Sequence, residues 1–222
     1  MGRRRHHGES AIRRFVDRRD AGRHLAGRLA AYADRADVIV LALPRGGVPV
    51  AFEIARALGA PLEVFAVRKL GVPGHPELAM GAIASGGVRI VSRAIVDDLG
   101  IDSDTVDAVA DREAAELERR ERLYRGDQAL PALEGRTVIL VDDGLATGAT
   151  MEAAIMAVRR LGAARIVAAA PVGARDSCAR LARSADEVVC AEMPDDFHAV
   201  GEWYQRFDQT TDDEVIELLR LR

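Results

Sequence analysis

The sequence predicts an α/β fold in which a parallel, doubly wound sheet carries helices on both of its faces. Two observations support this prediction: short apolar runs alternate with helical patterns along the chain, and short joints containing glycine separate them. Strand–helix alternation of this kind is typical of doubly wound sheets. The apolar runs are continuous, which indicates strands buried on both faces, as the strands of a parallel sheet are.

Six apolar runs rich in β-branched residues are the expected strands, over residues 37–43, 62–67, 88–91, 137–141, 165–170 and 187–191. Helical patterns precede or separate several of them, over residues 17–33, 48–58, 149–161 and 174–184. A chain of 222 residues is long enough to bury a full core without cross-links. We therefore expect a single domain over residues 1–222, with its core over about 15–192.

Two stretches depart from this alternation. Residues 69–87 are rich in glycine and contain two prolines, which predicts a long loop or a hairpin. Long loops inside a compact domain are typically functional lids or disordered segments. Residues 103–125 form a highly charged helical pattern that Asp102 introduces as a candidate N-cap.

The apolar stripe of this charged helix is narrow and consists of Val106, Ala110, Leu117 and Tyr124. One interpretation is a solvated helix that lies over an edge of the sheet. The other is a dimer contact, because Ala110, Leu117 and Tyr124 recur at a spacing of seven residues. We expect a homodimer.

Composition excludes several classes of protein. A formal net charge of −4 argues against a broad nucleic-acid-binding surface. No apolar run approaches the roughly 18 residues that a membrane span needs, and the first ten residues lack the apolar stretch of a secretory signal. The two cysteines, Cys178 and Cys190, match no metal-ligand spacing and indicate a reducing compartment. We therefore expect a cytoplasmic protein that binds neither nucleic acid nor membrane.

Residues 138–150, with the sequence VILVDDGLATGAT, carry the most specific pattern in the chain. An apolar strand ends in Asp142 and Asp143, and a glycine-containing loop with Thr147 and Thr150 then leads into a helix. The carboxyl end of a parallel strand is where α/β folds bind ligands, and amides that lead into a helix N-terminus bind anions. Two adjacent carboxylates suit the hydroxyls of a ribose or a hard cation such as Mg²⁺. The pattern thus favours a ribose 5-phosphate group, although an acidic turn before a capped helix is the plainer alternative.

This segment resembles the phosphoribosyl-pyrophosphate motif of the type I phosphoribosyltransferases. The resemblance implies that Asp142 and Asp143 bind the ribose hydroxyls and contribute to a Mg²⁺ site. It places the 5-phosphate on the loop that follows, formed by Gly144, Leu145, Ala146, Thr147, Gly148, Ala149 and Thr150. The family resemblance also implies a parallel doubly wound sheet with a small hood, here with the charged helix as an insertion.

The resemblance extends over nearly the whole chain. The sequence LPRGG at residues 43–47 resembles the family's pyrophosphate loop, with Arg45, Gly46 and Gly47 facing the leaving group. Residues 69–87 resemble the mobile flap of the family, and residues 193–222 would form the C-terminal hood and helix. The sequences FVDRRDAGRHLA and FHAVGEWYQRFDQTTDDEV resemble a bacterial subgroup of these proteins. Arg45 could instead pair with a carboxylate of the sheet.

Lys69 is the single lysine among 31 basic residues, and it lies at the start of the expected flap. It resembles basic flap residues that reach pyrophosphate in related proteins, although a lone lysine at a neutral surface position is the alternative. Some relatives place an aspartate before the Thr-Gly pair, where this chain has Ala146. Adenine-specific relatives use a flap glutamate, and Glu77 is the nearest analogue. Glu77 is therefore a candidate general acid or base, with a turn or salt-bridge role as the alternative.

Aromatic side chains are scarce, yet four of the nine lie within residues 197–207. Flat side chains stack on flat bases, so Phe197 and Trp203 are candidates for binding the acceptor. A small aromatic core that covers the sheet is the alternative interpretation.

The leading hypothesis is a Mg²⁺-dependent phosphoribosyltransferase. It would transfer ribose 5-phosphate from phosphoribosyl pyrophosphate to a small nitrogenous acceptor, a nucleobase and preferably a purine, with release of pyrophosphate. The alternative is a non-catalytic regulator that binds phosphoribosyl pyrophosphate or a nucleotide. A sugar-phosphate hydrolase ranks last, because the sequence offers no evident nucleophile.

Overall fold

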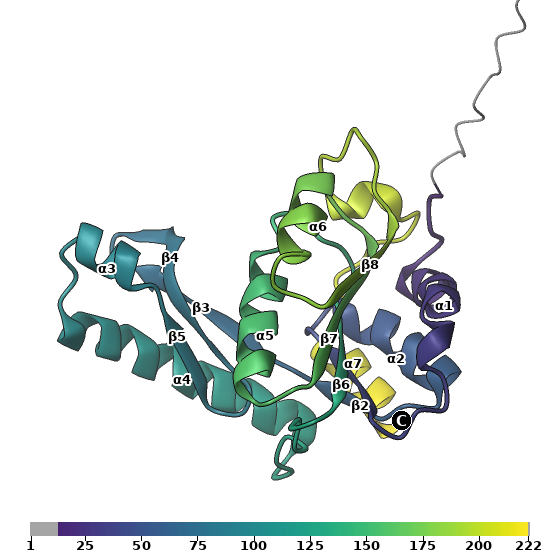
Figure 1. Cartoon of the computed structure of the whole chain (residues 1–222), viewed down its shortest axis with the longest axis horizontal. Coiled ribbons are helices and arrows are strands. Elements are labelled where there is room, and N and C mark those ends of the chain that lie inside the picture. Colours follow the sequence, from purple (N-terminus) through teal and green to yellow (C-terminus); the bar gives the residue numbers. More distant parts are fainter. Residues whose placement is uncertain (1–12, 222) are drawn as a thin grey trace, which may run out of the picture.

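The centre of the fold is a five-stranded parallel sheet in the strand order β2-β1-β6-β7-β8 (Figure 1). The computed structural model describes residues 13–221. The first ten residues, where we expected no secretory signal, lie outside the described residues. The strands are β1 (Val38–Ala42), β2 (Leu62–Val64), β6 (Thr137–Val141), β7 (Arg165–Val172) and β8 (Glu187–Glu192). Every residue of β1 and β6 is buried, which confirms the prediction of a parallel sheet covered on both faces.

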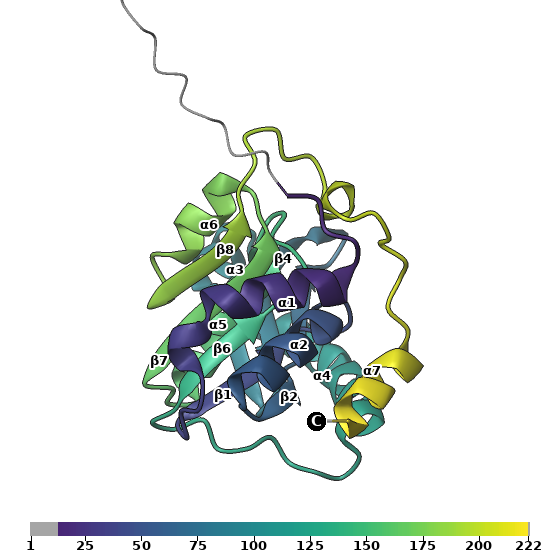
Figure 2. The same ribbon diagram turned by 90° about the vertical axis from the view of Figure 1, so that its right-hand side faces the viewer.

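Helices cover both faces of this sheet, with α1 (Arg18–Arg28) and α2 (Gly47–Leu58) on one side and α5 (Ala149–Arg160) and α6 (Arg175–Leu181) on the other (Figures 1 and 2). Alternate residues of each strand point into the two layers, as the pleat requires. In β1, for example, the core beneath α1 and α2 takes Val38, Val40 and Ala42, and the core beneath α5 takes Ile39 and Leu41. The prediction of an α/β, doubly wound fold is confirmed.

A second, antiparallel sheet projects from the main body (left in Figure 1). It consists of β3 (Val67–Val72), β4 (His75–Ala84) and β5 (Val88–Val91), and the helices α3 (Arg93–Asp98) and α4 (Ser103–Arg125) follow it. The hairpin alternative for residues 69–87 is therefore confirmed, because β3 and β4 pair over their length, with bulges at Gly71.

Residues 88–91 form a strand with the predicted bounds, but the assignment of two predicted strands to the parallel sheet was wrong in this region. Residues 88–91 belong to the antiparallel sheet, where β5 is an edge strand, and not to the buried parallel sheet. Its residues alternate in burial, with Arg89 exposed and Ile90 buried, which is the pattern of a half-buried antiparallel strand. The run over residues 62–67 is also divided: β2 ends at Val64, and Val67 already belongs to the second sheet.

The charged helix α4 has the predicted bounds, and the Asp102 side chain caps it by accepting a hydrogen bond from the Thr105 amide. The apolar stripe of α4 is buried inside the chain. Val106, Ala110 and Leu117 pack against the second sheet, and Tyr124 packs in the core beneath α1 and α2. A dimer contact through these side chains is therefore ruled out as an explanation of their spacing.

The C-terminal segment returns along the N-terminal one. A short 3-10 helix, η2 (Val200–Trp203), precedes an isolated bridge between Tyr204 and Phe15, and α7 (Asp212–Arg220) then packs near α2 and α4 (Figure 2). A second 3-10 helix, η1 (Ala30–Tyr32), follows α1. None of the helices over residues 13–221 combines the length and the apolar character that crossing a membrane requires.

Candidate active site

Two loops leave the carboxyl ends of the neighbouring strands β1 and β6 and lie side by side. The strands pair in parallel along their full lengths, and the Leu43 amide donates to the Val141 carbonyl at 2.9 Å. Residues 43–47 and the loop that begins at Asp142 therefore meet at one edge of the sheet. This edge is where doubly wound sheets bind ligands.

The contact between the loops depends on glycine. A Cβ atom added at Gly46 would lie 2.1 Å from Oδ2 of Asp143, and one added at Gly47 would lie 2.5 Å from the Val141 carbonyl oxygen. Both distances are too short for any side chain. The sequence GG at this point thus lets the first loop pass directly over the acidic pair.

The two carboxylates of the acidic pair have unequal surroundings. Asp143 Oδ2 accepts a hydrogen bond from Arg18 Nε at 2.8 Å, and the Asp143 carbonyl oxygen accepts one from the Tyr204 hydroxyl at 2.6 Å. Asp142 Oδ1 accepts from the Asp143 amide at 2.9 Å. Burial raises the pKa of Asp142 well above its usual value, and the adjacent charge of Asp143 raises it further.

The loop after the acidic pair is held from behind. Leu145 forms a parallel bridge with Gly173, the residue that follows β7, and helix α6 supports the next two residues. The Ser177 hydroxyl donates to the Ala146 carbonyl at 2.6 Å, and the Arg180 guanidinium donates to the Thr147 carbonyl. The carbonyl oxygens of the loop are thereby turned toward α6.

The loop then enters helix α5 through Gly148, whose φ of +68° lies in the left-handed region. Around this entry, Ala146, Thr147, Ala149 and Thr150 are exposed. Amides that lead into the N-terminus of a helix are favourable for a phosphate group, because the helix dipole adds to their hydrogen bonds. The loop geometry is therefore suited to an anion.

The comparisons with known proteins agree with this geometry. The family model described as "Phosphoribosyl transferase domain" matches residues 15–206. The chain belongs to this family. The predicted family is therefore confirmed, and so is the parallel α/β fold that it implied.

Two kinds of relative show how this phosphoribosyl transferase domain occurs elsewhere. Proteins of Mycobacterium tuberculosis, from strains H37Rv and CDC 1551, are 53% identical over 206 residues, which is 92% of this chain and 46% of theirs. Their names assign them provisionally to the phosphoribosyl transferases, and the chain spans about half of their length. The crystal structure of the protein TT1426 from Thermus thermophilus matches with a TM-score of 0.83 at 45% identity, covering 93% of this chain and 97% of that one.

The two expected basic residues of the site, Arg45 and Lys69, have different surroundings. Arg45 extends toward helix α7, where its Nη1 is 4.0 Å from Asp212 Oδ1, so it pairs with a helix and not with the sheet. Lys69 is exposed on β3 and lines a cavity of about 530 Å³ that also includes Thr150. That cavity links the second sheet to the loop over residues 144–150.

Glu77 lies on the outer half of β4, where the strand is exposed. The cavity that includes Lys69 and Thr150 is lined by Pro76 and not by Glu77. Within residues 13–221, no hydrogen bond or ion pair joins Glu77 to the acidic pair, and its role as a general acid or base stays a prediction.

The aromatic residues of the C-terminal segment form part of the core. Tyr204 is almost completely buried, stacks on Phe207 at 4.9 Å between ring centroids and contacts Phe15 at 5.8 Å. Phe197 and Trp203 are half-buried against the same core. A small aromatic core is thus present, and acceptor binding by Phe197 and Trp203 stays a prediction.

The acidic pair offers the donors that a Mg²⁺ ion with a phosphate substrate would use. Within residues 13–221, no group of three or more His, Cys, Asp or Glu side chains is arranged to hold a metal ion. Mg²⁺ is commonly bound by one or two carboxylates together with substrate phosphates. Asp142 and Asp143 fit this pattern, with Asp143 already paired to Arg18.

Sequence reasoning missed the residues that support the site. They are Arg18 and Tyr204 on Asp143, and Ser177 and Arg180 on the loop. Arg18 lies 125 positions before its partner, so no spacing in the sequence connects the two. Within FVDRRDAGRHLA it is one of three arginines, and nothing local distinguishes it.

Proposed function

We propose that this phosphoribosyl transferase domain transfers ribose 5-phosphate from phosphoribosyl pyrophosphate to a small nitrogenous acceptor. One observation carries the proposal: the acidic pair, the anion-binding loop and the Arg45–Gly47 loop meet at the carboxyl ends of β1 and β6. A diol, a 5-phosphate and a pyrophosphate attached to one sugar need these three features side by side. A nucleobase, preferably a purine, is the proposed acceptor.

The proposed reaction replaces one bond at C1 of the ribose. The C1–O bond to pyrophosphate breaks, with the electron pair leaving on the pyrophosphate oxygen, and the acceptor nitrogen then forms a C1–N bond and loses its proton. Asp142 and Asp143 would orient the diol and stabilise positive charge on the sugar ring. Amides of residues 144–150 would hold the 5-phosphate in place, which keeps C1 in position for the acceptor.

Negative charge accumulates on the departing pyrophosphate, so cations must face it. Arg45 and the amides of Gly46 and Gly47 would bind it from the β1 side, and Lys69 would approach from β3. Bound Mg²⁺ would neutralise part of the phosphate charge. Preorganised groups of this kind contribute most where charge develops. The β3–β4 hairpin is the proposed lid that limits the access of water.

Binding of phosphoribosyl pyrophosphate with Mg²⁺, measured by calorimetric titration, tests the proposal. The Asp142→Asn, Asp143→Asn double variant should lose at least about two orders of magnitude in affinity, because both oxygen acceptors for the diol lose their charge. The matched control is Asp97→Asn with Asp98→Asn, an adjacent aspartate pair in α3. It should bind like the wild type.

Three results would separate the alternatives. No binding by the wild type, or equal binding by the acidic-pair variant, would contradict the proposal. Binding followed by pyrophosphate release with a purine base would support the transferase. Binding without release in the presence of any nucleobase would favour the non-catalytic regulator.

The expected homodimer belongs to the same proposal. Analytical ultracentrifugation of the purified chain measures the oligomeric state. The side chains buried along α4 cannot form the dimer interface, because they pack inside the chain. A monomer that retains full activity would contradict it.

A further inference from the structure

Arg18 is the first residue of helix α1, yet its side chain ends in the candidate active site. The guanidinium Nε donates to Asp143 Oδ2 at 2.8 Å, and only 12% of the Arg18 side chain and 16% of the Asp143 side chain are exposed. The ion pair is therefore shielded from most of the solvent. Such a pair interacts more strongly than an exposed one and depends on the presence of both partners.

Three contacts, from two parts of the chain, fix the Arg18 guanidinium. Besides the carboxylate of Asp143, it donates through Nη1 to the Asp208 carbonyl at 2.6 Å. Its central carbon also lies 3.9 Å from the centre of the Phe207 ring. A flat guanidinium can stack on a ring and donate within its own plane at the same time, which the ammonium of a lysine cannot do.

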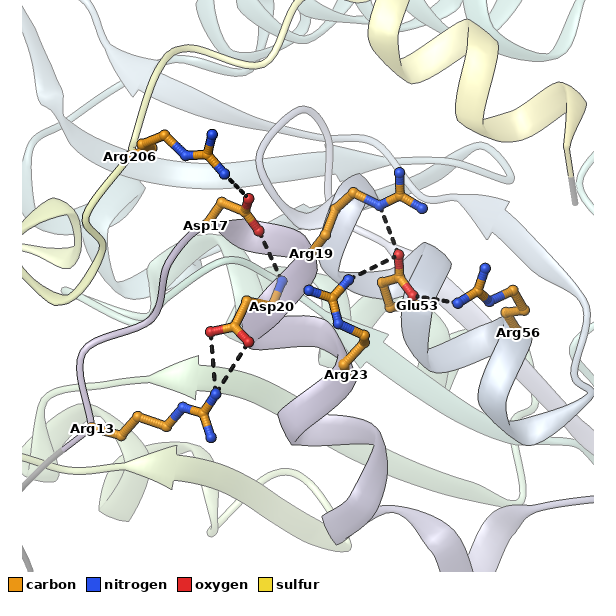
Figure 3. Close-up of polar contacts among 8 residues, drawn as sticks. All are labelled: Arg13, Asp17, Arg19, Asp20, Arg23, Glu53, Arg56 and Arg206. Atoms are coloured by element: carbon orange, nitrogen blue, oxygen red, sulfur yellow. Dashed lines mark hydrogen bonds and ion pairs between the residues drawn. The ribbon is translucent and has the colours of Figure 1, made fainter.

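The residues on both sides of Arg18 are anchored as well (Figure 3). Asp17 accepts from the Asp20 amide at 2.9 Å, which caps α1, and it also pairs with Arg206 at 2.6 Å. Arg19 donates to the buried carboxylate of Glu53 in α2 at 2.7 Å. The first turn of α1 is thus attached to the C-terminal segment on one side and to α2 on the other, so the Arg18 side chain starts from a fixed position.

Arg18 supplies a positive charge at a place where the proposed substrate and the acidic pair are both negative. Phosphoribosyl pyrophosphate is a polyanion, and two neighbouring carboxylates repel both it and each other. One positive charge in contact with Asp143 offsets part of this repulsion. It also keeps Asp143 Oδ2 beside Gly46, where a Cβ atom would lie 2.1 Å from that oxygen.

We propose that Arg18 is a positioning residue for the acidic pair, an inference that rests on the proposed function. Arg18 sets the orientation of the Asp143 carboxylate and neutralises it, so that this group can accept a hydrogen bond from a ribose hydroxyl. Asp142 then carries the uncompensated charge of the pair. The N-terminal helix and the C-terminal segment thereby become part of the substrate site, although the motif at residues 138–150 lies in neither of them.

Replacement of Arg18 tests this role. Arg18→Gln should weaken binding of phosphoribosyl pyrophosphate with Mg²⁺ by about tenfold to about a hundredfold, the usual effect of losing one charged hydrogen bond. Arg18→Lys should recover part of the affinity, because the charge remains while the stacking on Phe207 is lost. The matched control is Arg23→Gln, which lies on α1 like Arg18 and removes a guanidinium 3.6 Å from Glu53 of α2. This variant should bind like the wild type.

A crystal structure of the Arg18→Gln variant supplies a readout that needs no substrate. We expect the Asp143 carboxylate to leave its position beside Gly46. The thermal unfolding temperature should fall further than in Arg23→Gln, because the ion pair of Arg18 is shielded whereas the Arg23 side chain is exposed. An unmoved Asp143 carboxylate, or unchanged affinity in Arg18→Gln, would overturn the inference. If Arg18→Gln does not fold, the same two measurements on Arg18→Lys decide.

The two proposals fail in different ways. A wild-type chain that does not bind phosphoribosyl pyrophosphate contradicts the proposed function, and the position of Asp143 in the variant structure still decides the role of Arg18. A wild-type chain that binds it, together with an Arg18→Gln variant that binds equally well, contradicts only the role of Arg18.

Discussion

Asp142 and Asp143 are neighbours in the sequence, but folding gives their carboxylates different surroundings. Asp143 has a cationic partner at 2.8 Å, whereas Asp142 is half-buried and lies beside the negative charge of Asp143. Replacing each aspartate by asparagine should therefore change the free energy of unfolding in opposite directions at the two positions. Substrate-binding sites commonly retain such unfavourable charges, because function requires them at a cost in stability.

Asp142→Asn should raise the free energy of unfolding near neutral pH. The raised pKa means that the folded chain keeps a proton on Asp142 after the unfolded chain, with its pKa near 3.8, has lost it. Wild-type stability therefore falls as pH rises from the unfolded pKa through the folded one. The gain in the variant should appear over that window and persist above it. Urea denaturation in metal-free buffer at several pH values measures the difference.

Asp143→Asn should lower the free energy of unfolding, in contrast to Asp142→Asn. It leaves the largely buried Arg18 guanidinium without a charged partner, so we expect a loss on the order of 2 kcal/mol at neutral pH. Equal shifts of both single variants, or a gain for Asp142→Asn that does not depend on pH, would show that burial does not distinguish the two carboxylates.

Helix α6 supports the loop over residues 144–150, which we propose binds the 5-phosphate. It spans Arg175–Leu181, shorter than the helical pattern over 174–184 predicted, and two of its side chains donate to loop carbonyls. A loop that binds phosphate through its amides must keep its carbonyls turned away. Hydrogen bonds from α6 to the Ala146 and Thr147 carbonyls would meet this requirement and would fix the backbone before a ligand binds.

Ser177→Ala should weaken both the fold and the loop. The buried Ser177 hydroxyl donates to the Ala146 carbonyl at 2.6 Å, and losing this hydrogen bond costs about 1 kcal/mol. We also expect a several-fold loss of affinity for phosphoribosyl pyrophosphate by calorimetry. Ser184→Ala is the control, because that hydroxyl bonds only to the Leu181 carbonyl among the contacts of the described chain. Equal effects of both variants on affinity would contradict a supporting role for α6.

The molecule as a whole contains a main body and a second sheet with a core of its own. They are joined by α4 and by Ala84 and Ile90, which pack in the core beneath α5. The main sheet lies between the cores under α1 and α2 and under α5 and α6, while β3, β4 and α4 enclose a third core. The far end of α4 reaches the main body, where the Tyr124 hydroxyl donates to Asp212 at 2.5 Å. A small separate core of this kind can open without global unfolding.

Leu70→Ala should destabilise the second sheet by about 2 to 5 kcal/mol, because Leu70 is fully buried in its core. Hydrogen exchange should show the loss of protection mainly over residues 67–125. Leu140→Ala, which truncates an equally buried side chain of β6, should reduce protection throughout the main sheet. A uniform loss in the Leu70 variant would show that the chain unfolds as one unit.

Local sequence was enough to predict most elements and the central pattern of the site. Residues 137–141 and 103–125 have the predicted bounds, and the acidic pair lies at the end of its strand as the motif required. These features depend on residues within a few positions of one another. Apolar periodicity, an N-cap and a run of small residues beside carboxylates are all readable at that range.

By itself, the sequence determined the α/β class, the parallel sheet and the family of this protein. The tertiary structure decided which strand runs form the second sheet, that the α4 stripe packs inside the chain, and that Arg18 meets Asp143 across 125 positions. The physical reason is that secondary structure follows from neighbouring residues, whereas these pairings depend on which distant surfaces exclude water together. No periodicity encodes that choice, and the support of the acidic pair is therefore visible only in the folded chain.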